Sequence, residues 1–387
     1  MENKIEKNNE EIEKIENSQK DFESLQENEE KKKFYLFKKV GIVDRYNFYE
    51  YLGVLLDGGV NIGEAILTAG EKIQNSFFRE KIRNELYTYV SSGDTLSKSM
   101  KKLPFIFENS EVAIIEAGET TGMINIALSR LSDELKKNYV LRQKVKSALT
   151  YPIIIFLFLL VALIIVLTYV IPAITPLFDN SGVELPFSTK ALISTSYFVS
   201  HNFILLLLGV FALFVFFIGY KGTEKGKANI DYFLLSIPLI GKVYRNYILA
   251  GIASNFGNLI SSGVPVIKAL SLVGKTSNNM VYETIFNSII ERVSKGEKIT
   301  DAMKEVDKTT GFFPGDFIQM LSVGEKTATL DKVSQKIYNQ YSREVEYSLG
   351  NLTKWIEPIA ILFAGAFVLW FAFAIFGAIL KVTQTVG

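Results

Sequence analysis

Three long uncharged runs of apolar residues dominate the hydropathy pattern of this chain. Residues 152–171 and 358–380 carry no charged side chain, and residues 203–220 are almost entirely aliphatic or aromatic. About 20 apolar residues is the length that an α-helix needs to cross the hydrocarbon core of a bilayer. The pattern therefore predicts three transmembrane helices, over residues 151–171, 191–220 and 356–380.

The positions of lysine and arginine predict how these helices are oriented. Basic residues cluster in 136–146, before the first helix, and in 221–227, after the second, whereas residues 172–190 hold Lys190 alone. Cytoplasmic loops carry the excess of lysine and arginine. We expect an outer loop over 172–190, a cytoplasmic N-terminus, and a short outer tail over 381–387, although Lys381 weakly opposes this orientation.

The polar parts of the chain contain an internal repeat. Residues 48–71 align with 252–275, and the later pairs of matching segments are 90–100 with 293–303 and 116–124 with 322–330. Apolar residues recur at helical spacing in both copies, and paired glycines such as Gly58 and Gly59 end the helices. The sequence predicts an all-α fold with two repeated cytoplasmic helical bundles, over 41–150 and 221–355, each leading directly into a transmembrane helix.

The first 40 residues are rich in charge, and their apolar stripe is sparse. We expect residues 1–40 to form a solvated arm, partly helical or disordered, in preference to a coiled coil that binds a partner. The segment lacks the apolar core and small-residue cleavage site of a secretory signal.

Composition excludes most catalytic chemistry. The chain has no cysteine, one histidine, 42 basic and 41 acidic residues. Thiolate and multi-histidine metal sites are therefore absent, and the balanced charge gives no reason to expect nucleic-acid binding. Val273 to Thr276 resembles the end of a phosphate-binding loop, but Ala269 stands where that loop requires glycine. We predict no enzyme activity, no cofactor and no metal site.

Charged residues gather around two glycine motifs near the ends of the repeats. If the first helix continues through Gly118, Glu116 and Glu119 lie on one side of it; if it breaks there, Thr120 or Thr121 caps the next helix and Glu119 lies near that helix's N-terminus. A turn and cap is favoured over a partner contact or cation site. The residues of these candidate turn or partner-contact motifs are Glu116, Gly118, Glu119, Thr121, Gly122, Gly324, Glu325 and Thr327.

Pro152 and Pro358 stand where the first and third membrane helices begin, at corresponding positions of the repeat. Proline is tolerated in the first turn of a helix. We expect each to set the angle of its helix, and a sharper hypothesis is that they couple the bundle to the membrane helix. The small-residue pairs Ala360 with Ala364 and Ala374 with Ala378 suit close helix packing, either within a subunit or between subunits.

The ordered motifs resemble the family of type II secretion F proteins, the platform proteins of type II secretion and type IV pilus assembly. The resemblance covers residues 46–380, and the segments that carry it are GETTG at 118–122, ALTYP at 148–152, LFDNSGVELPFST at 177–189, GEKT at 324–327 and IEP at 356–358. Ala328 departs from the family pattern, which usually has glycine there, so a continuous helix is expected at that point.

The resemblance implies a non-enzymatic inner-membrane platform that works with a cytoplasmic hexameric ATPase. It also implies pilins or pseudopilins and other inner-membrane assembly proteins as partners, contact with membrane lipid, and a homo-oligomer. The machine is a secretion system, a pilus or a competence pilus. The alternative is a membrane permease subunit, which would need polar residues along its transmembrane helices. A signalling receptor would need a larger outer domain than residues 172–190.

Overall fold

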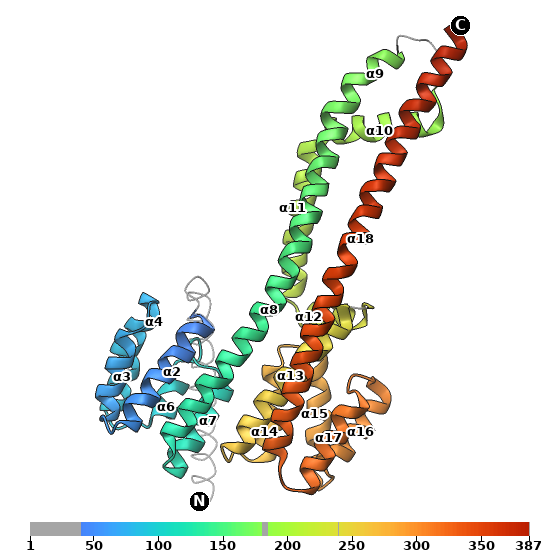
Figure 1. The fold of residues 1–387 in the computed structure, drawn as a ribbon. Helices are drawn as coiled ribbons and strands as arrows, with labels where there is room; N and C mark the ends of the chain where they lie inside the picture. Colours follow the sequence, from blue (N-terminus) through green and yellow to red (C-terminus); the bar gives the residue numbers. More distant parts are fainter. Residues whose placement is uncertain (1–39, 180–184, 239, 387) are drawn as a thin grey trace, which may run out of the picture. The chain divides into compact units, whose positions relative to one another are not determined.

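The computed structural model describes residues 40–179, 185–238 and 240–386, and the arm predicted over 1–40 lies outside them apart from Val40. Every element in the described part is helical, so the predicted all-α fold is confirmed (Figure 1). The elements are α2 (Ile42–Asp57), α3 (Ile62–Glu71), α4 (Ser76–Lys81), the π-helical turn η2 (Ile82–Leu86), α5 (Tyr87–Ser91), α6 (Leu96–Lys101), α7 (Asn109–Thr121), α8 (Ile124–Ile165), the π-helical turn η3 (Val166–Val170), α9 (Ile171–Asp179), α10 (Phe187–His201), α11 (Phe203–Lys221), α12 (Glu224–Ser236), α13 (Ile240–Ser261), α14 (Val266–Thr276), α15 (Met280–Ser294), α16 (Ile299–Thr310), α17 (Gly315–Lys326) and α18 (Leu330–Val386).

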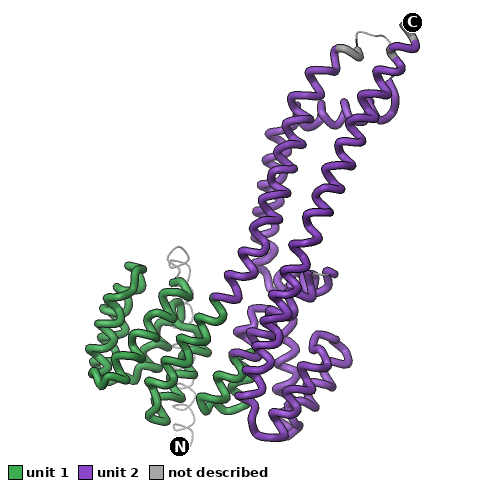
Figure 2. The backbone as a smooth tube through the Cα atoms, in the orientation of Figure 1, with its two compact units in different colours: residues 1–139, 255–273 green, residues 140–254, 274–387 purple. Residues whose placement is uncertain are grey.

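The chain forms two compact units, coloured separately in Figure 2. The first holds residues up to 139 together with 255–273, and the second holds 140–254 and 274–387. Residues 255–273 belong by sequence to the second repeat, yet they join the first unit. There Arg130 donates to the carbonyl of Ser261 at 2.8 Å.

In the first unit, α2 packs on α3 and α6 packs on α7. Helix α2 ends at Asp57 because Gly58 and Gly59 follow, and Gly59 has the left-handed φ of 79° that favours glycine. Asn61 then caps α3 by accepting from the amide of Gly63 at 2.9 Å. The core between these helices is aromatic, with Phe48 and Phe78 fully buried and their rings edge to face.

The second unit contains the later helices of the second repeat. Helices α15, α16, α17 and α18 pack on one another in chain order. Asn279 caps α15 by accepting from the amides of Val281 and Tyr282, as Asn75 caps α4 in the first unit by accepting from Phe78. The same local rule therefore starts the corresponding helix in each repeat.

Three helical segments are long and apolar enough to cross a membrane: Ile124–Pro176, Phe203–Lys221 and Leu330–Lys381. The chain is therefore a multi-pass membrane protein. Pro152 and Pro358 lie inside the long helices α8 and α18, so the expectation that they occupy the first turn of a helix is wrong. The helix has already formed many turns before each proline, which then leaves only one carbonyl, four residues earlier, without its usual partner.

The second membrane helix is shorter than the predicted range 191–220. The chain breaks at Asn202, and α10 packs instead against η3 and α18. Ser196 donates to the carbonyl of Leu167, and Thr189 donates to that of Ala374. These hydroxyl bonds hold α10 against its neighbours. Of α10 and α11, only α11 has the length and hydropathy of a membrane helix.

Helix α10 also covers small residues of α18. Ala374 and Ala378 are fully buried, and a Cβ on Gly377 would lie 3.5 Å from Pro186. Leu167, Ile171, Leu192 and Ala374 form one buried apolar cluster. This small-residue pair therefore packs within the subunit.

Candidate functional site

The glutamate of the first glycine motif links two helices, α7 and α6, by hydrogen bonds that we call a joint. Glu119, near the end of α7, accepts from the amides of Leu96 and Ser97 at 2.6 and 3.1 Å, and from the Ser97 hydroxyl. These amides belong to the first turn of α6, where a helix has no internal partners for them. The carboxylate thus caps α6 from a helix that follows it, and its charge is favourable at the positive end of the helix dipole.

The second motif forms the same joint in the second unit. Glu325 of α17 accepts from the amides of Ile299 and Thr300 at 2.6 and 3.1 Å, and from the Thr300 hydroxyl at 2.5 Å. Helix α16 has Lys298 at its N-cap, with no side-chain capping bond, whereas Thr95 caps α6 by accepting from Lys98. Glu325 therefore carries more of the capping in its repeat than Glu119 does. We name these two contacts the glutamate caps.

The threonines of the motifs do not cap the following helices, because the helix break at Gly118 which that alternative required does not occur. Thr121 donates to the carbonyl of Ala117 at 2.9 Å, and Thr327 donates to that of Val323 at 2.8 Å. Helix α7 continues through Gly118 and ends at Thr121. The hydroxyls thus bond back to carbonyls one turn earlier in their own helix.

The glycines of the motifs allow close approach and a sharp turn. A Cβ on Gly118 would lie 2.5 Å from the Cβ of Ala127, and one on Gly324 would lie 3.0 Å from the Cβ of Val333. Gly122 ends α7 at φ 70°, and Ala328 ends the second motif at φ 54°. The expectation of a continuous helix at Ala328 is therefore wrong: the turn persists, and alanine adopts a conformation that favours glycine.

Glu116 and Glu119 reach different partners, although they lie one turn apart. Glu116 pairs with Lys268 of α14 at 2.8 Å, and both side chains are about half exposed. The lysine lowers the pKa of Glu116 through a hydrogen bond and its charge. Within the described residues no group of three or more histidine, cysteine, aspartate or glutamate side chains has the arrangement of a metal site.

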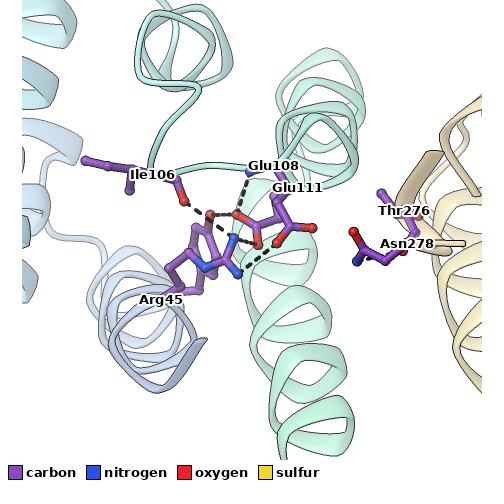
Figure 3. Close-up of polar contacts among 7 residues, drawn as sticks. Arg45, Ile106, Glu108, Glu111, Thr276 and Asn278 are labelled. Atoms are coloured by element: carbon purple, nitrogen blue, oxygen red, sulfur yellow. Dashed lines mark hydrogen bonds and ion pairs between the residues drawn. The ribbon is translucent and has the colours of Figure 1, made fainter. Parts of the chain in front are cut away.

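A buried ionic network in the first unit was not predicted from the sequence (Figure 3). The Arg45 guanidinium of α2 lies 2.7 Å from Glu111 and 2.9 Å from Glu108, and it also donates to the carbonyl of Ile106 at 3.4 Å. The Tyr49 hydroxyl donates to the second oxygen of Glu111 at 2.8 Å. The network joins α2 to the start of α7, where Glu108 and Glu111 also form a capping box.

Burial and charge act in opposite directions on this network. Burial raises the pKa of Glu111, against the lowering effects of Arg45 and the Tyr49 hydroxyl. Burial alone lowers the pKa of Arg45, but the carboxylates of Glu111 and Glu108 raise it above its ordinary value. Loss of Arg45 leaves the buried carboxyl group of Glu111 without its cation, which is costly in the core.

Glu134 of α8 is a second buried carboxyl group in the first unit. It is 5% exposed, and its Oε2 atom has no hydrogen-bond partner among the residues that the structure describes. Burial raises its pKa to about 8, helped by Glu111 and Glu108, while a hydrogen bond from Asn258 and the charge of Lys137 lower it. A protonated carboxyl group suits such a position, because an isolated buried carboxylate is costly.

These features define a membrane protein built from two related helical repeats that continue into apolar helices. The chain belongs to the family of type II secretion system protein F, whose pattern matches residues 48–172 and 252–378. The two matched segments begin at the aligned positions of the internal repeat.

Named relatives come from both kinds of machine. Type IV pilus assembly protein PilC of Thermus thermophilus is 31% identical over 347 residues, covering 90% of this chain and 84% of that protein. PilC of Pseudomonas aeruginosa is 29% identical and covers 90% of this chain and 92% of that protein. Type II secretion system protein F of Pseudomonas aeruginosa is 27% identical and covers 87% and 82%.

Proposed function

We propose that this platform protein passes motion from a cytoplasmic assembly ATPase to pilin or pseudopilin subunits in the membrane. Its place in the family makes it an inner-membrane platform protein of a type II secretion or type IV pilus system. A competence pilus belongs to the same class of machine. The ATPase contact, the pilin contact, other inner-membrane assembly partners and a homo-oligomeric state are parts of the proposal.

The observation that carries the proposal is the continuity of α18. This helix runs from Leu330 to Val386 without interruption, joining the helical part of the second unit to a membrane helix. At 1.5 Å per residue its 57 residues extend about 85 Å. Force applied to the bundle reaches the membrane through one helix, and no loop intervenes to absorb it.

The base of α18 is fixed to its neighbours in the bundle. Tyr341 and Gln340 donate to the two oxygens of Asp316 on α17, at 3.1 and 2.8 Å. Gly324 lets α17 approach α18 at Val333, and Glu325 ties α17 to α16. Displacement of these helices is therefore transmitted to α18 rather than lost at the contact between them.

The family is a structural platform rather than an enzyme, and we propose that ATP is hydrolysed by the partner. A permease is not favoured, because the apolar runs 152–171, 203–220 and 358–380 contain no aspartate, glutamate, lysine or arginine. A transport path through these helices would lack the charged groups that mark one.

We place the two helical repeats and the N-terminus in the cytoplasm, and the C-terminus outside. Reporter fusions at residues 100, 300 and 387 test this orientation in cells. Cytoplasmic signals at the first two positions and an outer signal at the last are expected. Opposite sides for the two repeats would contradict the proposal, since one motor could not then act on both.

Co-purification tests the motor contact directly. The full-length chain in detergent should retain the assembly ATPase of its own machine. The variant Lys295→Glu, at the exposed end of α15, is the control for a nonspecific effect of charge on that binding. Failure of the ATPase to bind in the nucleotide-free, ATP-bound and ADP-bound states would contradict the proposal.

A further inference from the structure

Helix α12 begins directly below the second membrane helix (Figure 1). Thr223 caps it by accepting from the amide of Gly226 at 3.0 Å. Asn229 donates to the Tyr220 hydroxyl at 2.8 Å, and a Cβ on Gly226 would collide with the carbonyl of Tyr220. The side of α12 that carries Gly226 and Asn229 therefore faces the end of the membrane helix.

The other side of α12 is fixed to the bundle. Asp231 is 6% exposed and accepts from the amide of Met280, the first residue of α15, at 2.8 Å. A carboxylate is favourable at the N-terminus of a helix. Leu235, one turn later, is also buried. These contacts fix the rotation of α12 about its own axis.

Phe233 lies on the face of α12 that Gly226 and Asn229 define. Residues spaced by three, four and seven lie on the same side of a helix, and Phe233 is about 10 Å further along the axis than Gly226. Its side chain is 64% exposed, and it makes no ring contact with a described residue. Ile230 and Ile237 flank it at half-buried positions. The apolar face thus extends past the membrane helix with no described protein over Phe233.

Aromatic side chains mark the level at which the membrane helices meet water. Tyr151, Tyr220 and Trp355 stand at the same ends of the three apolar runs, and all are exposed. Tyrosine and tryptophan are enriched at this level of a bilayer. Since Tyr220 is the hydrogen-bond partner of Asn229, α12 lies at this level too.

Basic residues surround the exposed ring. Lys221, Lys225 and Lys242 are exposed, and none forms an ion pair with a described residue. Glu224 is the exposed acidic residue of α12. Lysines beside an apolar helix face attract anionic headgroups, because an anionic leaflet has a negative surface potential.

We propose that α12 is an interfacial helix that inserts Phe233 into the leaflet on the side of the helical bundles and binds anionic phospholipid headgroups through Lys221, Lys225 and Lys242. The membrane is the favoured occupant because the apolar face continues directly from a membrane helix. Asp231 on one side and Phe233 on the other hold the bundle of the second unit at a fixed height below the bilayer. The inference does not depend on the motor or on pilins.

Fluorescence quenching tests the insertion. The chain has no cysteine, so Phe233→Cys gives a single labelling site in the full-length protein. An environment-sensitive fluorophore at this position, in phosphatidylglycerol vesicles, should be quenched by lipids carrying a nitroxide near the headgroup. Val323→Cys is the matched control, because Val323 is an exposed apolar residue of α17. Helix α18 follows α17 and extends about 40 Å before it reaches Pro358, where the apolar run begins.

We expect quenching to be several-fold stronger at position 233 than at 323. Ile237→Cys, on the same face, should show the same excess, and circular dichroism checks that each variant is folded. Equal quenching at 233, 237 and 323 would overturn the proposal. Shielding of 233 from aqueous iodide without lipid quenching would also overturn it, because it indicates a protein partner or a second copy.

The lysines are tested by lipid composition. Insertion of the label at 233 should be stronger in phosphatidylglycerol than in phosphatidylcholine vesicles. Each change of Lys221, Lys225 or Lys242 to glutamine should reduce that preference by about fivefold, the effect of one lysine near an anionic leaflet. Lys295→Gln, on the exposed end of α15, should leave it unchanged. An unchanged preference in the triple glutamine variant would overturn the headgroup contact.

Discussion

The two repeats bury different residues at matching positions. Where the first buries Arg45 and Glu111, the second buries Leu249 and Phe317, and Tyr49 corresponds to Ala253. The glutamate caps and the close glycines are nevertheless present in both. The joints between helices therefore do not depend on an ionic core. The Arg45 network is present in the first repeat and is replaced by apolar residues in the second.

Removing the charge of Arg45 should have the largest effect on stability, and only in the first repeat. Arg45→Ala leaves Glu111 buried without its cation and should destabilise the first unit by about 3–5 kcal/mol. Hydrogen exchange of α2 and α7 amides in the full-length protein measures the loss. The triple change Arg45→Leu, Tyr49→Ala and Glu111→Phe installs the residues of the second repeat and should recover most of it. A triple variant as unstable as Arg45→Ala would show that the two cores are not interchangeable.

Closing the glycine contacts should have the next largest effect. Gly118→Ala places a methyl group against Ala127 and should cost about 1–3 kcal/mol. Gly324→Ala should cost less, because its Cβ has 0.5 Å more room against Val333. Thermal unfolding of both variants tests the order, and a greater loss for Gly324→Ala would contradict the measured spacing.

For the glutamate caps, the loss of stability should be larger in the second repeat than in the first. Glu325→Ala leaves α16 without a side-chain cap and should cost about 1–2 kcal/mol, whereas after Glu119→Ala helix α6 keeps Thr95. Each variant should speed hydrogen exchange at the start of its own helix only. Faster exchange in both helices from either change would mean that the joints are not independent.

The last difference between the repeats is a dependence on pH. The folded pKa of Glu134, about 8, lies above the ordinary value of 4.5, so folding binds a proton between these values. This contribution is full below about pH 4.5 and is lost as pH rises through 8. Gln340 stands at the matching position of the second repeat and cannot titrate.

Glu134→Gln copies that residue into the first repeat. It should leave the thermal midpoint unchanged at pH 5 and raise it at pH 9, where the parent buries a carboxylate. A midpoint of the Glu134→Gln variant that fell with pH as steeply as the parent's would exclude Glu134 as the cause.

The sequence predicted features that depend on local pattern. The repeat, the helical fold and the apolar runs could be predicted because glycines, spacing and hydropathy are visible within a short window. Glu119 was expected near a helix N-terminus, but the helix it caps begins 23 residues earlier, and spacing along one helix cannot reveal such a partner. The same reason hid the pairing of Arg45 with Glu111, which are 66 residues apart.

Other differences arise from packing between helices. The polar residues of α10 suggested only a weak start to the second membrane helix, whereas Ser196 and Thr189 bond to carbonyls of other helices. The turn at Ala328 persists without glycine because Thr329 donates its amide to the Gly324 carbonyl at 2.8 Å and Thr327 bonds back to Val323. The partners of Ser196 and Thr189 lie 29 and 185 residues away, beyond the reach of a local pattern, whereas the bonds at Ala328 are local and replace the conformational freedom of glycine.

The central claim is that unbroken helices carry motion from the bundles into the membrane. Replacing Asn351, Leu352 and Thr353 of α18 with three glycines should weaken the helix by about 3 kcal/mol relative to three alanines, while both variants lose the same polar and apolar groups. Filament assembly in cells should persist with the alanines and fail with the glycines, at equal levels of inserted protein. Equal assembly by the glycine variant would contradict the claim.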